Sequence, residues 1–419
     1  MPLTTIRWRS MRWAAGLIFL VLLLGVFITP VRNRIFAVTP SVSGENVLQF
    51  QFETRTPGFL TGAPFAWSPD GKRLISGMLT RPDAAGRQDV SLWMFDVDGE
   101  KAVGRRVLDG RGTADAGIAW SPDGELLAVV KTDEIRVYST RDFREISYRR
   151  IAAGDPDLDN PQRVSLPTAV AFAKDSASLW IARLGQNVRA RFGAAVRLDA
   201  RTLNVIDSYE IDPPIPGNRT VSASTTIEAT PDGPRLLALI ASYTGIKAPN
   251  GADTAHRFAY GVDLDNKREL FPHFRLVEEN NIFQSPLDFL LSPDNAILIT
   301  FLPTTTDPRQ DLRNYRDTDV YSTATGQRTA LFDTAKVHSE EHPSLRFFGR
   351  SGAVLIAKSY RVSDKAPGLI VFETNTGAII QRVTGKLLTG ELGFSWDRRR
   401  MVASLSPFGE GMQFFGVNR

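Results

Sequence analysis

Two of the four histidines in this chain of 419 residues stand close together. His338 and His342 occur in the string HSEEH, which matches an H-x-x-E-H pattern used to bind zinc. That pattern works on a helix, because there side chains four residues apart share one face. Pro343 follows directly, and the surroundings read as a short connection. We therefore expect a solvated loop, with a zinc site as the alternative.

The string DPDLDN at Asp155–Asn160 resembles the opening of a calcium-binding loop. Its sixth position is Asn160 instead of glycine, and its twelfth is Leu166 instead of a bidentate glutamate. A charged surface loop is the interpretation we favour over calcium. Cysteine is absent, which excludes disulfides, thiolate metal sites and a cysteine nucleophile. We predict no catalytic residues, no metal site and no cofactor.

A sequence motif that recurs along the chain indicates the fold that would position any functional residues. Its clearest copies are FAWSPDGKRLIS at Phe65–Ser76 and IAWSPDGELLAV at Ile118–Val129. Weaker copies begin at Val170, Ile227, Phe289, Arg346 and Gly393. Each copy reads as a strand, a tight polar turn and a second apolar strand. Seven copies at roughly fifty-residue spacing are typical of a repeat architecture.

A third strand, another tight turn and a fourth strand follow each copy except the last. Four short antiparallel strands per repeat form the blade of a β-propeller. The sequence therefore predicts an all-β, seven-bladed propeller of four-stranded antiparallel blades over residues 46–419. The seventh copy lacks a fourth strand, whereas Asn46–Glu53 alternates apolar and polar residues ahead of the first blade. We expect this segment to pair with Met412–Val417 and to close the ring.

The turn inside each copy has a structural explanation. Proline presets φ, aspartate caps its own backbone and glycine tolerates positive φ. We therefore interpret residues such as Asp70 and Asp123 as structural, not as acids or metal ligands. Trp67, Trp120 and Trp180 lie within the strand signatures and are predicted to be core residues.

The signature WSPDGKRLIS resembles the WD40-like repeats of TolB-type and prolyl-oligopeptidase-type propellers. The turns STATGQRTA and ETNTGAII resemble those of YVTN-like surface propellers. The match is short in each repeat but recurs over residues 46–419, and blades 6 and 7 depart from it at Ser351 and at Asp397-Arg398. The resemblance implies a propeller, but not the families' activities. The chain shows neither the α/β domain of TolB nor the G-x-S-x-G elbow of the peptidases.

The N-terminus carries an uncharged run, Trp13–Val31, of spanning length. We predict a cytoplasmic segment over residues 1–12, a transmembrane signal anchor over residues 13–31, and a tether over residues 32–45. A cleaved signal peptide is the alternative, although no tidy cleavage site follows. Three arginines precede the run and two follow it. This bias places the propeller on the non-cytoplasmic side, periplasmic or extracellular.

The charge balance argues against nucleic acid as a partner. The net charge is +4, but five arginines lie before residue 35, where acidic residues are absent, so the remainder carries about −1. A near-neutral propeller lacks the general positive field that phosphate binding needs.

Loop lengths distinguish the two faces of the predicted ring. The second-to-third connections and the blade-to-blade connections emerge on one face and are long; we call this the long-loop face. Among them we expect loops over Arg183–Gly193 and over Ser242–Arg257, which contains His256. The other two turns of each blade are tight and emerge on the plain face. Long loops on a rigid scaffold commonly carry binding. Our candidate partner-binding residues are Arg183, Arg189, Arg191, Arg309, Arg313, Tyr315 and Arg316.

The alternative for these arginines is ordinary solvation and pairing with Asp307, Asp311 and Asp317. Taken together, the sequence predicts a membrane-anchored propeller that serves as a protein-binding or scaffold module in the cell envelope. An enzyme or small-ligand sensor that uses the central channel is the alternative function.

Overall fold

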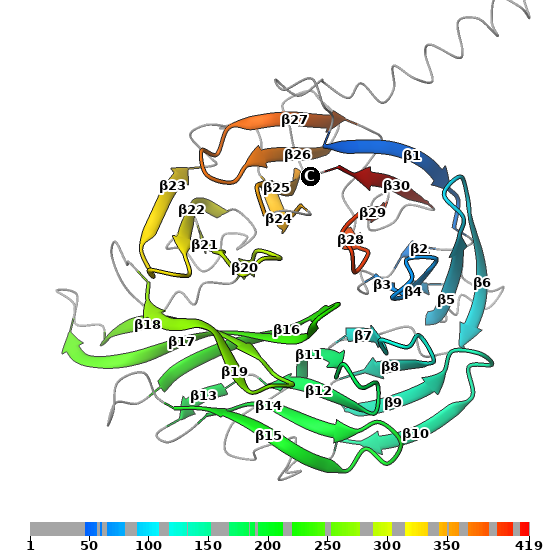
Figure 1. The fold of residues 1–419 in the computed structure, drawn as a ribbon, viewed down its shortest axis with the longest axis horizontal. Coiled ribbons are helices and arrows are strands. Elements are labelled where there is room, and N and C mark those ends of the chain that lie inside the picture. Colours follow the sequence, from blue (N-terminus) through cyan, green and yellow to red (C-terminus); the bar gives the residue numbers. More distant parts are fainter. Residues whose placement is uncertain are drawn as a thin grey trace, which may run out of the picture.

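Seven β-sheets form a ring in the computed structural model (Figure 1). The structure describes residues 47–56, 59–60, 65–79, 90–108, 117–131, 133–151, 167–183, 185–188, 192–212, 220–247, 253–276, 288–303, 315–333, 343–349, 352–359, 368–384, 392–404 and 411–418. Each sheet is one blade, which confirms the predicted all-β, seven-bladed propeller. The first strands lie toward the centre and the fourth strands at the rim (Figure 1).

The strands of each blade follow in chain order, except that β13 (Gly185–Val188) joins blade 4 from within the blade 3 sequence and β1 (Leu48–Thr54) completes blade 7. Blade 1 contains β2 (Phe59–Leu60), β3 (Ala66–Trp67), β4 (Arg73–Leu79), β5 (Val90–Val97) and β6 (Ala102–Leu108). Blade 2 contains β7 (Gly117–Trp120), β8 (Leu126–Val130), β9 (Glu134–Ser139) and β10 (Glu145–Arg150). Blade 3 contains β11 (Pro167–Phe172), β12 (Ser178–Arg183), β14 (Phe192–Asp199) and β15 (Val205–Ile211).

Blade 4 contains β13 (Gly185–Val188), β16 (Thr220–Thr230), β17 (Gly233–Lys247), β18 (Asp253–Asp263) and β19 (Arg268–Arg275). Blade 5 contains β20 (Asp288–Leu291), β21 (Ile297–Pro303), β22 (Tyr315–Ser322) and β23 (Arg328–Asp333). Blade 6 contains β24 (Pro343–Phe348), β25 (Val354–Ser359), β26 (Gly368–Glu373) and β27 (Ile379–Thr384). Blade 7 contains β28 (Leu392–Phe394), β29 (Arg400–Ser404), β30 (Met412–Val417) and β1 (Leu48–Thr54).

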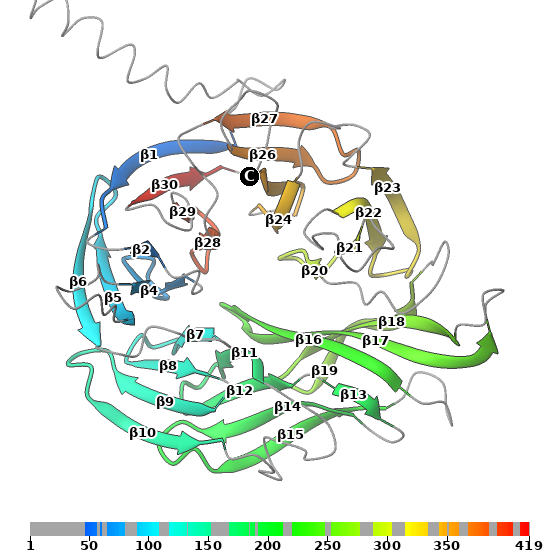
Figure 2. The same cartoon turned by 180° about the vertical axis from the view of Figure 1, so that it is seen from behind.

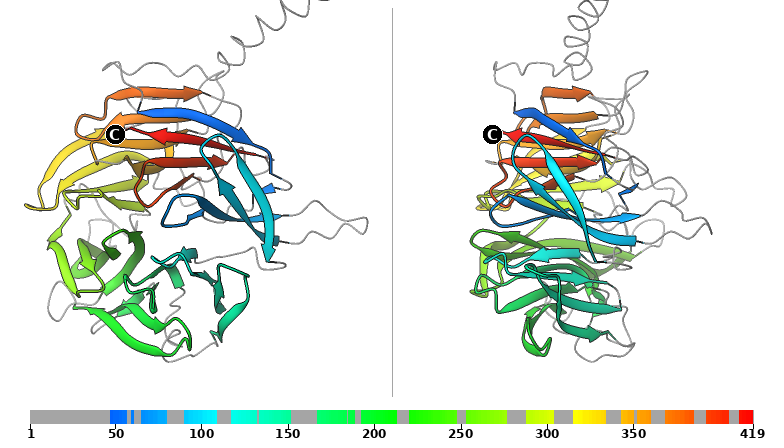
Figure 3. Two further views of the ribbon diagram at one scale, coloured as in Figure 1. Left: turned by 45° about the vertical axis from the view of Figure 1, so that its right-hand side comes forward. Right: turned by 90° about the vertical axis from the view of Figure 1, so that its right-hand side faces the viewer.

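The two ends of the ring are joined in blade 7, as predicted. Strand β1 pairs antiparallel with β30, from Leu48 opposite Val417 to Thr54 opposite Met412 (Figure 3). The closing strand also contacts both neighbouring blades. The side-chain amide of Gln381 in blade 6 hydrogen-bonds the main chain of Leu48, and the Thr54 hydroxyl donates to the carbonyl of Ala102 in blade 1.

The apolar core is divided among the interfaces between blades. Buried apolar residues of the described chain form seven clusters, and each cluster draws on two adjacent blades. The predicted core tryptophans Trp67, Trp120 and Trp180 are each at most 2% exposed. Because every blade is buried only by its two neighbours, closure between blades 7 and 1 completes the last interface.

Blade 4 differs from the expected four short strands. Strands β16, β17 and β18 have 11, 15 and 11 residues, and their hairpins extend to one side of the ring (Figure 2). The expected loop Ser242–Arg257 is largely this hairpin, and His256, which we expected in a loop, lies in β18. The expected loop Arg183–Gly193 contains β13, which adds a fifth strand to blade 4 by pairing with β16. The sequence did not indicate these features because β13 is short and lacks apolar alternation, and the segment around Pro249, Asn250 and Gly251 has the composition of a loop.

The signature turns behave as the sequence predicts. The Ser68 hydroxyl donates to Asp70 at 2.5 Å, and Asp70 in turn accepts the backbone N–H of Lys72. Blades 2, 5 and 7 repeat this arrangement at Asp123, Asp294 and Asp397. The aspartates of these turns are therefore structural.

The N-terminal predictions lie outside this description. Residues 1–46, including the predicted anchor and tether, are not among the described residues. Within the part of the chain that the structure describes, no helix is long and apolar enough to span a bilayer.

Candidate functional site at the plain-face centre of the ring

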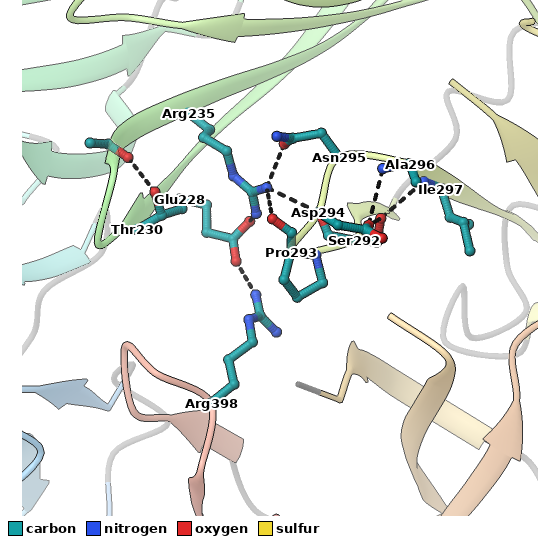
Figure 4. Close-up of polar contacts among 11 residues, drawn as sticks. Glu228, Thr230, Arg235, Ser292, Pro293, Asp294, Asn295, Ala296, Ile297 and Arg398 are labelled. Atoms are coloured by element: carbon teal, nitrogen blue, oxygen red, sulfur yellow. Dashed lines mark hydrogen bonds and ion pairs between the residues drawn. The ribbon is translucent and has the colours of Figure 1, made fainter. Parts of the chain in front are cut away.

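Glu228 on the inner strand β16 interrupts the repeat. The equivalent position carries Ala66, Ala119, Ala171, Leu290, Phe347 and Gly393 in the other six copies. The Glu228 side chain is only 27% exposed, so its charge requires ion-pair or hydrogen-bond partners. The carboxylate forms ion pairs with two arginines, one from its own blade and one from blade 7 (Figure 4).

Arg235, at the third position of β17, is the first partner. Its guanidinium donates from Nη2 to Glu228 Oε2 at 2.6 Å. Its Nη1 donates to three acceptors of blade 5, namely the carbonyls of Ser292 and Pro293 and Oδ1 of Asn295 at 2.6 Å (Figure 4). With a side chain only 7% exposed, Arg235 holds the carboxylate in place and fastens blade 4 to blade 5.

The repeat position of Arg235 also carries arginine in two other blades, and there too the arginine contacts a neighbouring blade. Arg400 of blade 7 donates to the carbonyl of Gly71 in blade 1 at 3.0 Å. The guanidinium of Arg73 in blade 1 lies 4.8 Å from the ring centre of Trp120 in blade 2. Each of these arginines thus contacts the next blade. The interblade role of Arg235 is structural, and only its contact with Glu228 is special to blade 4.

Arg398, in the turn between β28 and β29, is the second partner. It stands where blades 1 and 2 have Gly71 and Gly124, and it adopts the same left-handed backbone, with φ 53°. A side chain there costs about 1 kcal/mol relative to glycine. The guanidinium bonds to Glu228 Oε1, so blades 4 and 7 are bridged across the centre of the ring (Figure 4).

The two arginines determine the ionisation of Glu228. Burial opposes ionisation, but the charges of Arg398 and then Arg235 outweigh it and hold the pKa of Glu228 below its usual value. The carboxylate is therefore charged throughout the neutral range. The arrangement is a fixed ion triad, and it lacks the raised pKa expected of a general acid.

A cavity of about 420 Å³ adjoins the triad on the plain face. Its walls come from blades 4, 5 and 7 and include Leu270, Pro293 and Trp396 beside the triad. No cluster of three or more His, Asp or Glu side chains suited to a metal ion occurs in the described ranges. The cavity combines an oriented carboxylate, guanidinium groups and apolar walls, which are features of a binding site.

The candidate residues on the long-loop face are partly placed. Arg183 ends β12, and its carbonyl accepts the Thr225 hydroxyl of blade 4 at 2.6 Å. Tyr315 and Arg316 begin β22 in blade 5. These chain positions therefore belong to the blades on either side of blade 4. Arg189, Arg191, Arg309 and Arg313 lie outside the described residues, as do the HSEEH string and Asp155–Asn160.

Sequence reasoning did not identify the triad. A signal was present, because Glu228 and Arg398 are exceptions to the repeat at their respective positions. What the repeats alone do not reveal is that the two exceptions meet, since they are 170 residues apart in the chain.

Comparisons with known proteins support the fold. No protein-family model matches the chain, and no curated protein matches its sequence. The fold matches 846 chains of solved structures, so the architecture alone does not specify an activity. One of these is titled hydrazine synthase, from Kuenenia stuttgartiensis; it has 16% identity and a TM-score of 0.52, and the match covers 88% of this chain and 98% of that one. At this level of identity, the likeness establishes the β-propeller fold and no shared activity.

Proposed function

We propose that the chain is a membrane-anchored β-propeller of the TolB-type or YVTN-like kind that serves as a protein-binding or scaffold module in the cell envelope. The anchor is the uncharged run Trp13–Val31, and the propeller lies on the non-cytoplasmic side. The partner is a protein with an acidic surface, which contacts the long-loop face.

The observation that carries this proposal is the enlargement of blade 4. The second-to-third connection of blade 3 forms β13, which pairs with the first residues of β16. The pairing of β17 with β18 continues as far as Lys247 opposite Asp253. These additions lie at the strand ends from which the long connections leave, so they enlarge the long-loop face with hydrogen-bonded strands. A rigid projection loses little entropy when it binds, which favours recognition.

Charge supports the choice of an acidic partner. Residues 184–192 carry Arg189 and Arg191 and no acidic residue, whereas the three arginines within residues 303–318 are matched there by Asp307, Asp311 and Asp317. Charged residues at a binding surface steer association and determine specificity more than they stabilise the fold.

Affinity capture of the full-length chain from detergent-solubilised membranes tests the proposal. Reversing Arg189, Arg191, Arg313 and Arg316 to glutamate should leave folding intact and weaken recovery of the partner, most clearly at low salt. The matched control reverses four exposed plain-face residues, Lys72, Arg141, Arg201 and Arg399. Loss of recovery in the control, with normal recovery by the long-loop variant, would reject the proposed face.

The anchor and orientation have their own test. A periplasmic or extracellular reporter fused after Arg419 should be active, and the chain should resist extraction by alkaline carbonate. A fusion active only in the cytoplasm would overturn the orientation, and a mature N-terminus after Val31 would overturn the anchor.

A small-ligand sensor is the second candidate function, and the cavity of about 420 Å³ beside the ion triad favours it. This function would use the plain face. In the capture experiment it predicts no partner whose recovery depends on the long-loop arginines.

A further inference from the structure

We propose that Glu228 forms a guanidinium-binding site on blade 4, at the plain-face centre of the ring, and that Arg398 of blade 7 fills this site in cis. The ligand class of the unfilled site is an arginine side chain or another monosubstituted guanidinium. This inference concerns the plain face and is independent of the function proposed for the long-loop face.

The carboxylate is oriented for a second guanidinium by contacts that do not involve Arg398. Its Oε2 is held by Arg235, and Arg235 is itself fixed by the Ser292, Pro293 and Asn295 acceptors of blade 5. Glu228 Oε1 points the other way, toward the centre of the ring, where Arg398 meets it (Figure 4). The acceptor is therefore oriented by residues of blades 4 and 5 alone.

The surroundings suit a guanidinium better than a compact ammonium. A guanidinium is planar and weakly hydrated, so it can bond a carboxylate at its edge while its faces contact apolar groups. Apolar side chains of this kind, Leu270 and Trp396, line the cavity together with Glu228 and Arg398. The Arg398 guanidinium also lies 5.9 Å from the ring centre of Phe394.

The backbone indicates that Arg398 is kept for its side chain. Residues at the equivalent turn position adopt positive φ in the other blades as well, and four of those six are glycine. Glycine would make the turn without the cost of a side chain. The other two, Ser176 and Asn295, each use the side chain to contact a neighbouring blade. Arg398 is the one whose partner lies on a blade that is not its neighbour.

Replacing Arg398 by glycine tests the site, because R398G restores the residue found in most copies and leaves Glu228 unfilled. The melting temperature of R398G should rise with methylguanidinium chloride and reach a plateau. The concentration that gives half of this rise should be about tenfold lower than for the unchanged chain. The double variant E228A/R398G, which returns both positions to the repeat, should show no saturable shift. Tetramethylammonium chloride, which has no N–H donor, should not raise the melting temperature of the unchanged chain, of R398G or of E228A/R398G.

A response of R398G no greater than that of E228A/R398G would overturn the proposal. Because R398G alters the backbone as well, R398A provides the same comparison with a side chain retained at the turn.

Cross-linking checks the contact itself, since the chain has no cysteine of its own. E228C/R398C should form an intramolecular link with a short bismaleimide, whereas E228C/R141C, with its second cysteine on an outer turn of blade 2, should not. Failure of the first pair to link would equally reject the proposal.

Discussion

Gln381 and Leu48 are 333 residues apart in sequence and are joined by two hydrogen bonds. The Gln381 side chain donates from Nε2 to the carbonyl of Leu48 at 2.8 Å and accepts the Leu48 N–H at 2.9 Å. Gln381 is 1% exposed, so water does not substitute for either bond. One side chain of blade 6 thereby fixes the strand that closes the ring.

Replacing this amide should destabilise the whole propeller. In Q381L the N–H and the carbonyl of Leu48 lose their buried partner, which should cost about 2 kcal/mol in the free energy of unfolding. Urea denaturation followed by circular dichroism measures the change. The control is Q327L at an exposed turn residue, which should alter stability by no more than about 0.5 kcal/mol. Equal effects of the two substitutions would contradict a special role for Gln381.

Deleting residues 45–54 should unfold the ring cooperatively. The deletion removes β1, and with it the buried Leu48 and Phe52, which pack in the interface clusters of blade 7 with blade 6 and with blade 1. Because each blade is buried only by its neighbours, opening one interface should weaken the ring as a unit. Hydrogen exchange should show loss of protection in all seven blades. Loss confined to blade 7 would show that the blades are independent.

Two glycines with nearly the same backbone provide a test of the turn geometry. Gly71 and Gly326 have φ of 66° and 67°. A Cβ at Gly71 meets no atom within 4 Å, whereas a Cβ at Gly326 lies 2.6 Å from Cβ of Phe274. G71A should therefore cost only the backbone penalty of about 1 kcal/mol, and G326A should cost at least about 2 kcal/mol because Phe274 must also move. The denaturation midpoint of G326A should therefore lie below that of G71A, and the reverse would contradict the prediction.

Acid should remove the contribution of Glu228 to stability. Its pKa in the folded chain lies below the usual 4.5 because Arg398 and Arg235 outweigh the effect of burial. The stabilisation is thus complete above pH 4.5 and is lost as the pH falls through the lower folded value. E228Q should cost about 2 kcal/mol at neutral pH, and the difference from the unchanged chain should shrink on acidification. The control E210Q, at an exposed glutamate, should have little effect at either pH; a pH-independent cost for E228Q would refute the ion triad.

The repeats made the ring predictable, because strand, turn and strand recur in a local pattern that apolar alternation reveals. The closing pair β1 and β30 was predictable for the same reason, since one copy lacked a strand and Asn46–Glu53 supplied one. Strand β13 was not predictable, because its four residues carry no strand pattern and their pairing with β16 depends on the geometry of blade 4. The contact of Glu228 with Arg398 depends on which blades face each other, and this is a property of the closed ring.

The proposal of recognition at the long-loop face is tested most directly by hydrogen exchange on the complex of the full-length chain with its captured partner. Peptides covering β13 and the start of β16, residues 185–188 and 220–223, should gain protection relative to the free chain. Plain-face turns that contain Lys72, Arg141 and Arg201 should exchange as before. Protection of those turns, with unchanged exchange in β13 and β16, would contradict the account.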